Sequence, residues 1–323
     1  MNIHLAQVIP KDFSCVYEFR TRLKAQRYPQ RITVVDEPSQ ADLIIFSECH
    51  QLPSDYRLRA ITQSEVARAF QDRIAVYDER ARPWCSLPGI YVNMPAKRFD
   101  RRWQVAGSYW HLEDHQERTE KEVGKPIKYL YSFMGSPTHR CRESIYSLTH
   151  RRSFVKRVDG FLFNDPSSQL FEERRKQFAE VMFQSSFVLC PRGHGPSSFR
   201  VYEALAAGRV PVIISDDWVQ PTGPDWAGFS IRWPEAQIST LPVELERREN
   251  EAAAMGVRAR EAFTEWFASD VALVKQIETL ASLLEQSPRR DFPKSGVRDF
   301  GFYKGVLIDP ARARLSIARR LRS

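Results

Sequence analysis

Residues Cys190 to Asp217 carry the clearest fold signal of the chain and read CPRGHGPSSFRVYEALAAGRVPVIISDD. It joins the end of an apolar run, FVLC, to a turn that contains two glycines. An amphipathic segment at 199–207 and a second apolar run at 210–214 follow. This order predicts a strand, a turn, a helix and a parallel strand, which is the repeating unit of an α/β sheet.

The turn has the residue types of a phosphate-binding loop. Gly193 and Gly195 allow the backbone to approach a ligand closely, and we expect them to adopt positive φ. Ser197 and Ser198 are suited to cap the helix that follows. The free N–H groups and the dipole at that helix start favour a phosphate. The alternative is an ordinary capped loop between a strand and a helix.

Three charged side chains complete this predicted site. Arg192 and Arg200 can form charge-assisted hydrogen bonds with the oxygens of a diphosphate. Glu203 lies three residues after Arg200, so the two share one helix face. Its carboxylate can accept hydrogen bonds from both hydroxyls of a ribose. The alternative is that Arg200 and Glu203 simply pair with each other.

The rest of the chain alternates between short apolar runs and amphipathic segments. Before residue 83, strands are predicted at 4–9, 32–35, 43–46 and 74–77, with helices at 12–27 and 56–70. A second set predicts strands at 127–133, 153–157, 187–190, 210–214 and 229–232, with helices at 140–148, 169–184, 199–207 and through much of 241–284. The segment 98–122 is interpreted as a linker or a domain-bridging region. We therefore predict two α/β domains, 1–120 and 121–290, followed by a basic tail at 291–323.

The net charge of +8 in 323 residues favours anionic partners, although a solvated arginine-rich face is an equal alternative. The tail ends in ARARLSIARRLRS, which can lie on an anionic membrane surface or pack back on the first domain. No apolar run approaches the ~20 residues that span a bilayer, and the first residues do not resemble a signal peptide. The five cysteines contain no CxxC pair and indicate a reducing compartment. We expect a cytoplasmic protein, and the first of these two placements of the tail would give it peripheral contact at the inner membrane face.

Three stretches resemble the exostosin-like glycosyltransferase family: YLYSFMGSPTHRCRESI, FVLCPRGHGPSSFRVYEALAAGRVPVIISDDW, and Asp225–Trp226 followed by FSIRW. Together they cover roughly the second half of the chain up to about residue 245, and the first half shows no matching motif. The resemblance implies a GT-B fold, in which two Rossmann-like domains face each other across a cleft. It also implies an inverting transferase that uses a nucleotide-sugar, commonly a UDP-sugar, and a glycan or glycolipid-type acceptor.

The resemblance assigns the donor site to the second domain. Gly135 and Arg140 would line the diphosphate side, and the turn and its helix would form the rest. Together with the pair Asp216 and Asp217, the predicted donor-binding residues are Gly135, Arg140, Arg192, Gly193, Gly195, Ser197, Ser198, Arg200, Glu203, Asp216 and Asp217.

Asp216 and Asp217 also raise the question of a metal. Metal-dependent transferases usually present Asp-x-Asp to a divalent ion, whereas these two aspartates are adjacent. Arginine side chains and a helix N-terminus can neutralise a leaving diphosphate instead. We therefore predict no metal ligands and no cofactor.

An inverting transfer needs a general base, which should come from the first domain. Glu48 and His50 follow the predicted strand at 43–46, and Asp78 and Glu79 follow the one at 74–77. Ligands of α/β sheets bind at such carboxyl ends of strands. Glu48 and Asp78 rank first, followed by His50 and Glu79, and the alternative for each is a capping or loop residue.

Two other functions stay open. A GDP-fucose-type GT-B transferase also has a glutamate-bearing helix followed by a strand that reads VPV. A non-enzymatic protein that binds nucleic acid or another anionic polymer would explain the positive charge. However, aromatic and basic residues do not alternate as they do in stacking platforms, so no nucleic-acid partner is expected.

Overall fold

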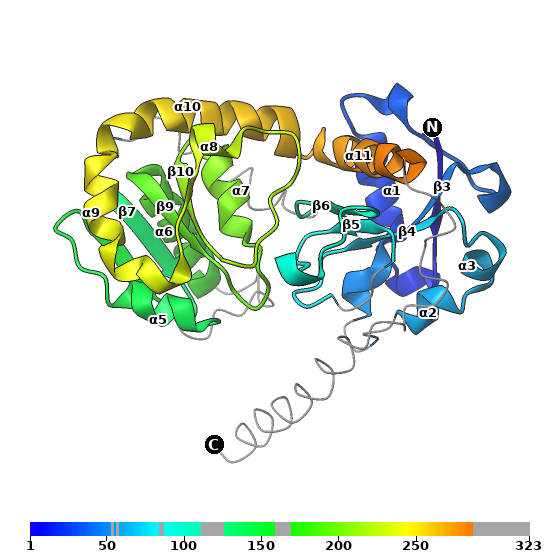
Figure 1. Cartoon of the computed structure of the whole chain (residues 1–323), viewed down its shortest axis with the longest axis horizontal. Helices are drawn as coiled ribbons and strands as arrows, with labels where there is room; N and C mark the ends of the chain where they lie inside the picture. The colour runs from blue at the N-terminus through cyan, green and yellow to red at the C-terminus, as the bar shows by residue number, and fades with distance from the viewer. Residues whose placement is uncertain (53–54, 56–57, 84–86, 111–125, 159–168, 287–323) are drawn as a thin grey trace, which may run out of the picture.

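The computed structural model describes residues 1–52, 55, 58–83, 87–110, 126–158 and 169–286. The chain forms two α/β domains that lie side by side, each built on one parallel sheet (Figure 1). This arrangement of two Rossmann-like domains confirms the predicted GT-B fold class.

The first domain holds a six-stranded parallel sheet with the strand order β2-β1-β3-β4-β5-β6. Its strands are β1 (Asn2–Ala6), β2 (Thr33–Val34), β3 (Leu43–Phe46), β4 (Ile74–Asp78), β5 (Gly89–Tyr91) and β6 (Gln104–Ala106). Strands β3 and β4 are buried at every residue. Such continuous apolar runs are typical of parallel strands covered on both faces.

Of the two interpretations of the segment 98–122, the linker is wrong for the described part. The segment contains β6, which pairs in parallel with β5 and extends the sheet. Its aromatic side chains Trp103, Tyr109 and Trp110 are buried. The two strands are three residues long, and β5 contains glycine, so neither shows the apolar run that marks a strand in a sequence. Residues 111–122 lie outside the described residues.

The second domain holds a five-stranded parallel sheet with the order β11-β10-β9-β7-β8. Its strands are β7 (Tyr129–Gly135), β8 (Ser153–Arg157), β9 (Ser185–Pro191), β10 (Val210–Ile214) and β11 (Ile231–Arg232). The predicted bounds of β8 and β10 agree with the structure. Parallel strands at neighbouring positions bring the turns after β7 and β9 to the same edge of the sheet.

Helices cover both sheets (Figure 1). In the first domain they are α1 (Val16–Lys24), α2 (Arg59–Thr62) and α3 (Glu65–Ala69); in the second they are α5 (Arg140–Tyr146), α6 (Gln169–Phe183), α7 (Phe199–Ala206), α8 (Trp226–Phe229), α9 (Leu241–Arg247) and α10 (Ala252–Ala262). The predicted single helix at 56–70 is replaced by α2 and α3, because α2 ends at Thr62 and Ser64 caps α3 by accepting from the N–H of Ala67.

The last described helix, α11 (Ala272–Gln286), returns to the first domain, where it contacts β5 and β6 (Figure 1). The predicted boundary at residue 290 placed this helix with the second domain. Its buried Gln276 bonds across the packing interface: Oε1 accepts from the Tyr77 hydroxyl at 3.0 Å and from the Ser108 N–H at 2.9 Å. Its Nε2 donates to the Ser108 hydroxyl at 3.0 Å. The chain therefore crosses between the domains twice.

The packing of α11 against the first domain should be stabilised by the buried Gln276 amide. We expect Gln276→Ala to lower the free energy of unfolding by about 2 kcal/mol, because the Tyr77 hydroxyl and the Ser108 N–H would lose a buried partner. Hydrogen exchange should also be faster in α11. Gln286→Ala, at the exposed end of the same helix, is the matched control and should change neither quantity. Equal effects of the two substitutions in urea unfolding would contradict this role.

Candidate functional site

A pocket of about 500 Å³ lies between the two domains. The first domain lines it with residues that follow the carboxyl ends of its strands: His50, Glu79, Ala81, Asn93 and Tyr109. The second domain contributes the turns after β7 and β9 and parts of α6 and α7. Both sheets therefore direct their carboxyl ends to one site, as the ligand sites of open α/β sheets do.

The turn that was predicted from the sequence forms part of the pocket wall. Gly193, Gly195, Ser197 and Ser198 all line it. Ser198 stands at the N-cap of α7 but makes no side-chain capping bond, so its hydroxyl does not occupy the helix start. The expectation of positive φ was wrong, because neither glycine of this turn has a left-handed backbone.

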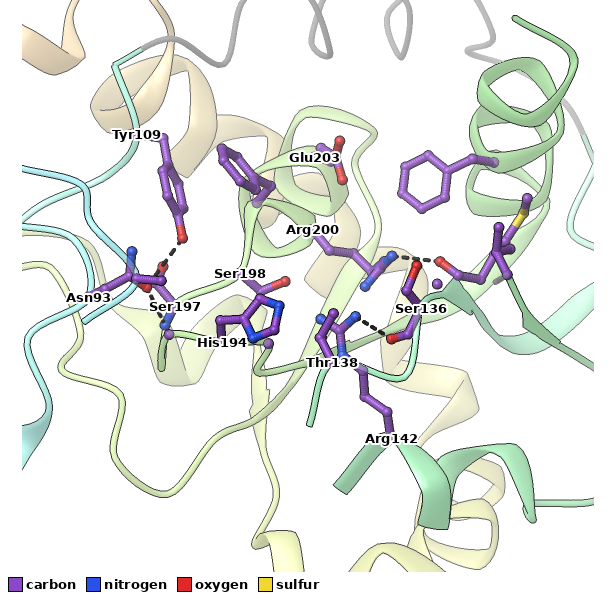
Figure 2. Close-up of a pocket in the computed structure, with 18 of the residues that line it drawn as sticks. Asn93, Tyr109, Ser136, Thr138, Arg142, His194, Ser197, Ser198, Arg200 and Glu203 are labelled. Carbon is purple, nitrogen blue, oxygen red and sulfur yellow. Dashed lines mark hydrogen bonds between the residues drawn. The ribbon is translucent and has the colours of Figure 1, made fainter. Parts of the chain in front are cut away.

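Gly195 is required for a different reason, which is the close approach of the first domain. A Cβ at this position would lie 2.3 Å from Asn93 Oδ1 and 2.9 Å from the carbonyl oxygen of Ala81. The same Asn93 Oδ1 accepts from the Ser197 N–H at 3.1 Å and from the Tyr109 hydroxyl at 3.3 Å (Figure 2). The turn and the first domain are thus fitted together without room for a side chain.

Tyr109 also closes this side of the pocket. Its ring stacks on Phe199, the first residue of α7, with the ring centroids 3.8 Å apart. Aromatic contacts of this kind contribute about 1 kcal/mol beyond the area they bury. The interface between the domains is therefore packed directly beside the helix start.

A methyl group at Gly195 should separate the domains. We expect Gly195→Ala to lower the free energy of unfolding by about 1–3 kcal/mol, as overpacked substitutions do. Gly193→Ala is the matched control, since its nearest contacts are at 3.2 Å, and they are the ends of the Arg142 and Thr138 side chains. Chemical denaturation that gives the control the larger effect would contradict this interpretation.

Four arginines line the pocket: Arg174 and Arg175 from α6, Arg142 from α5 and Arg200 from α7. Figure 2 labels Arg142 and Arg200. Arg142 donates to the carbonyl oxygens of Ser136 and Arg192, both at 2.9 Å, and of Pro191 at 3.3 Å. Arg200 donates to the carbonyl oxygen of Met134 at 2.6 Å. Within the described part of the chain, the hydrogen bonds of these two arginines thus go to neutral backbone groups.

The two guanidinium groups share one aromatic neighbour and repel each other. They lie 5.7 Å (Arg142) and 4.8 Å (Arg200) from the centroid of the Phe133 ring. Burial and the charge of Arg200 lower the pKa of Arg142 to about 10. Burial also lowers the pKa of Arg200, against the raising effect of Glu203. An anion bound here would relieve this repulsion.

Glu203 lines the same pocket from α7, on the helix face that carries Arg200, as predicted (Figure 2). Its side chain is buried. Met134, Val158 and Phe178 add apolar surface to the lining. Phe178 lies 5.2 Å from the Arg200 guanidinium. The pocket therefore combines a positive wall, a carboxylate and an apolar corner.

The structure separates the four candidate bases into two pairs. His50 and Glu79 line the pocket. Glu79 accepts a hydrogen bond from the Trp110 N–H at 2.5 Å, which fixes one of its oxygens. The His50 ring lies 6.1 Å from the ring of Trp110.

Glu48 and Asp78, which ranked first, do not belong to the pocket lining. Glu48 is fully buried and accepts from the N–H groups of Val8 and Ile9 and, at 2.5 Å, from the Ser14 hydroxyl. Asp78 is fully buried against Arg80, with 2.6 Å between Oδ2 and Nη2. Both carboxylates hold loops of the first domain.

Four predicted donor-site residues also lie outside the lining: Arg140, Arg192, Asp216 and Asp217. Arg192 reaches Asp217 at 3.3 Å, and Asp216 exchanges hydrogen bonds with the backbone and side chain of Glu235. Arg140 is exposed at the start of α5. Gly135 does line the pocket, as predicted.

Among the described residues, one cluster has the spacing of metal ligands: the candidate ligand atoms of His139, Cys141 and Glu235 lie within 4.8 Å of one another. His139 Nδ1 already accepts the N–H of Cys141 and caps α5. Burial and the positive charge of Arg192 lower the pKa of His139, opposed by Glu235. A metal cation would meet the same positive field.

Sequence reasoning missed the residues that complete the site. Arg142 lies two positions after the predicted Arg140 in α5. The helix directs Arg142 to the pocket and leaves Arg140 exposed. The first-domain residues come from the short strands that the sequence did not reveal. The lining residues outside the prediction include Ala81, Asn93, Tyr109, Ser136, Thr138, Arg142, Arg174, Arg175, Phe178 and His194.

Comparison with known proteins places this site in a family. Residues 89–248 match the sequence profile of the Exostosin GT47 domain, which includes β5, the turn after β9 and α7. Residues 89–248 thus form an exostosin-like glycosyltransferase domain. The predicted resemblance is thus confirmed, and the match extends into the first domain, where no motif was recognised.

Curated relatives agree with the profile. The chain is 30% identical over 148 residues to an Exostosin-1 homolog of Caenorhabditis elegans, which covers 40% of this chain and 38% of the relative. It is 28% identical over 186 residues to Exostosin-1c of Danio rerio, covering 54% of this chain and 23% of the relative. The chain thus spans less than two fifths of the length of these exostosins.

Two solved structures align with most of the chain. A glycosyltransferase from Rickettsia africae covers 88% of this chain and 99% of its own, with 10% identity and a TM-score of 0.45. Anabaena HepE in complex with UDP and glucose covers the same shares with 10% identity and a TM-score of 0.40. Within the described residues of this exostosin-like chain, no helix combines the length and apolar character that crossing a membrane requires.

Proposed function

We propose that this exostosin-like chain transfers a sugar from a UDP-sugar to a hydroxyl group of a glycan or glycolipid-type acceptor, with inversion at the anomeric carbon. The observation that carries the proposal is the pair Arg142 and Arg200, which share the Phe133 ring in the wall of the pocket between the domains. Two guanidinium groups at the start of a helix suit a diphosphate.

The diphosphate lies in the proposed complex between these arginines and the N-terminus of α7. The backbone at the start of α7 and the Ser198 hydroxyl can donate to its oxygens. Glu203 accepts the ribose hydroxyls. The base lies against the apolar corner of Met134, Val158 and Phe178.

Glu79 is our proposed general base, with His50 as the second candidate. Both lie in the first domain, opposite the donor groups. In the reaction, the acceptor oxygen bonds to the anomeric carbon from the face opposite UDP while the bond to the diphosphate oxygen breaks. The acceptor proton passes to the Glu79 carboxylate, and UDP leaves as an anion. The N–H of Trp110 orients the carboxylate by holding one of its oxygens.

We further propose that the leaving diphosphate is neutralised without a metal. Arg142 and Arg200 supply two positive charges where a divalent ion would supply the same number. Asp217 is engaged with Arg192, and Asp216 with Glu235. Turnover should therefore be insensitive to EDTA. As the compartment we propose a reducing one, such as the cytoplasm, because the described cysteines Cys15, Cys49, Cys141 and Cys190 are free buried thiols.

The proposal is tested by a donor screen that monitors nucleotide release from UDP- and GDP-sugars, together with thermal-shift titrations of UDP and GDP. Release from a UDP-sugar, with stabilisation by UDP, would support it. Stabilisation by GDP and release from GDP-fucose would replace it with the GDP-fucose-type alternative. Binding of neither nucleotide would defeat a donor site of this type.

The arginine pair should control nucleotide affinity. Arg200→Ala and Arg142→Ala should each weaken UDP binding at least about tenfold, because each removes charge-assisted hydrogen bonds to the phosphates. Arg140→Ala is the matched control, since this exposed arginine lies in α5 together with Arg142 but outside the pocket. Calorimetry that shows unchanged UDP affinity in Arg200→Ala would contradict the phosphate role.

The base assignment makes a different prediction. Glu79→Gln should lower the rate of transfer about 100-fold or more while UDP affinity stays the same, because the amide cannot take the proton. Glu48→Gln and Asp78→Asn should instead lower the free energy of unfolding, since they weaken buried hydrogen bonds. Transfer is measured per folded molecule.

Two outcomes would change this assignment. Full transfer by Glu79→Gln together with loss in His50→Gln would make His50 the base. Full transfer by both variants, with loss in folded Glu48→Gln or Asp78→Asn, would reject the pocket pair altogether.

A further inference from the structure

Asn93 bonds to both domains through one side chain. It follows β5, lines the pocket and is 3% exposed. Its Oδ1 accepts from the N–H of Ser197 in the turn at 192–198, which we call the donor turn. Its Nδ2 donates to the carbonyl oxygen of Glu79 at 3.1 Å. The same amide therefore joins the donor turn to the residue that serves as general base in the proposed function.

A second connection holds the other end of Glu79. The ring of Tyr109 stacks on Phe199, the first residue of the helix after the donor turn. The next residue in the chain, Trp110, donates its N–H to Glu79 Oε1 at 2.5 Å. The backbone and the carboxylate of Glu79 are thus both tied to residues that contact the donor side of the pocket.

Asn93 closes these two connections into a ring of contacts. Its Oδ1 also accepts from the Tyr109 hydroxyl at 3.3 Å (Figure 2). The path therefore leads from the Glu79 carbonyl through Asn93 and Tyr109 to Trp110, and back to the Glu79 carboxylate. Burial raises the pKa of Tyr109 to about 12, and the charge of Glu79 adds to the rise, so this charge acts at the hydroxyl that bonds to Asn93. Groups that are bonded on several sides in this way keep one arrangement.

The packing leaves the donor turn no room to move toward Asn93. A Cβ at Gly195 would lie 2.3 Å from Asn93 Oδ1. The oxygen of Asn93 alone would be enough to join the two domains at this contact. The bond from Nδ2 has a different effect, because it leads back into the first domain and ends on the backbone of Glu79. Asn93 thus sets where the Glu79 backbone lies relative to the donor turn.

We propose that Asn93 is a positioning residue, which holds the Glu79 carboxylate at a fixed place opposite the donor turn. The proposal rests on the proposed function and adds a residue that affects the transfer through Glu79 rather than through the substrate. A catalytic group that is displaced by about 1 Å can lose about 100-fold in rate. The rate should therefore depend on the bond that Asn93 Nδ2 donates to Glu79.

The test substitution is Asn93→Asp, which keeps the oxygen that accepts from Ser197 and Tyr109 but removes the Nδ2 donor. UDP release from UDP-glucose, UDP-galactose and UDP-glucuronate is measured on the full chain with water as the acceptor, and UDP affinity is measured by calorimetry. We expect release to fall about tenfold or more while UDP affinity stays the same. In a Glu79→Gln background the same substitution should lower the rate no further, because its effect passes through Glu79.

Two further variants complete the test. Asn2→Asp is the matched control, since it removes an Nδ2 donor that also bonds to a backbone carbonyl, that of Gln40 at 3.3 Å, outside the pocket lining. It should change neither release nor UDP affinity. Tyr109→Phe keeps the stacked ring and removes the hydroxyl that bonds to Asn93, so it should give a smaller loss of release at unchanged UDP affinity. This neutral variant decides the question if Asn93→Asp does not fold.

Each contrary result identifies which idea fails. Release at the wild-type rate by Asn93→Asp, or by Tyr109→Phe where Asn93→Asp does not fold, would overturn the positioning role. A loss of release that is matched by an equal loss of UDP affinity would assign Asn93 to donor binding instead. A further loss in the Glu79→Gln background would show that Asn93 acts by another route. A wild type that neither binds UDP nor releases it from any donor would defeat the proposed function itself.

Discussion

The repulsion between Arg142 and Arg200 is the physical constraint on which the rest of this site depends. Both guanidinium groups face the same Phe133 ring, and burial lowers the pKa of each. Backbone carbonyls and an aromatic face stabilise a cation but do not neutralise it. A pair of this kind lowers the stability of the protein without a ligand, and for this reason we propose an anionic ligand here. In that proposal the leaving diphosphate supplies the compensating negative charge.

The fold supplies the groups that hold these arginines. The carbonyl oxygens of Ser136 and Arg192 come from the ends of neighbouring strands β7 and β9, and both accept from Arg142. The opposite wall is fixed by Asn93, which bonds to the glycine-containing turn, and by α11, which crosses back to the first domain. Parallel pairing and the crossing helix thus convert distant segments into one cavity.

The sequence predicted the second domain better than the first, for reasons that individual residues show. Val210–Ile214 is buried at every position, and its apolar run marks the strand directly. Arg200 and Glu203 were found because their spacing sets one helix face. Strands β5 and β6 have three residues each and no such signal. The pocket residues that follow them, Asn93 and Tyr109, were therefore missed.

The sequence also could not predict which of the base candidates faces the pocket. Asp78 and Glu79 are neighbours after one strand, and successive side chains of an extended chain point in opposite directions. One pairs with Arg80 inside the domain, and the other lines the pocket. Which of the two points to the cleft depends on the packing of Arg80, and the pattern of residues does not contain that information.

The most direct test of the central claim compares the affinity of the chain for UDP with its affinity for uridine at the same ionic strength. If the paired arginines make the pocket a diphosphate site, UDP should bind at least about 100-fold more tightly, because two groups of charge-assisted hydrogen bonds are lost with the phosphates. Equal affinities for UDP and uridine would show that the phosphates meet no such site, and would contradict the account.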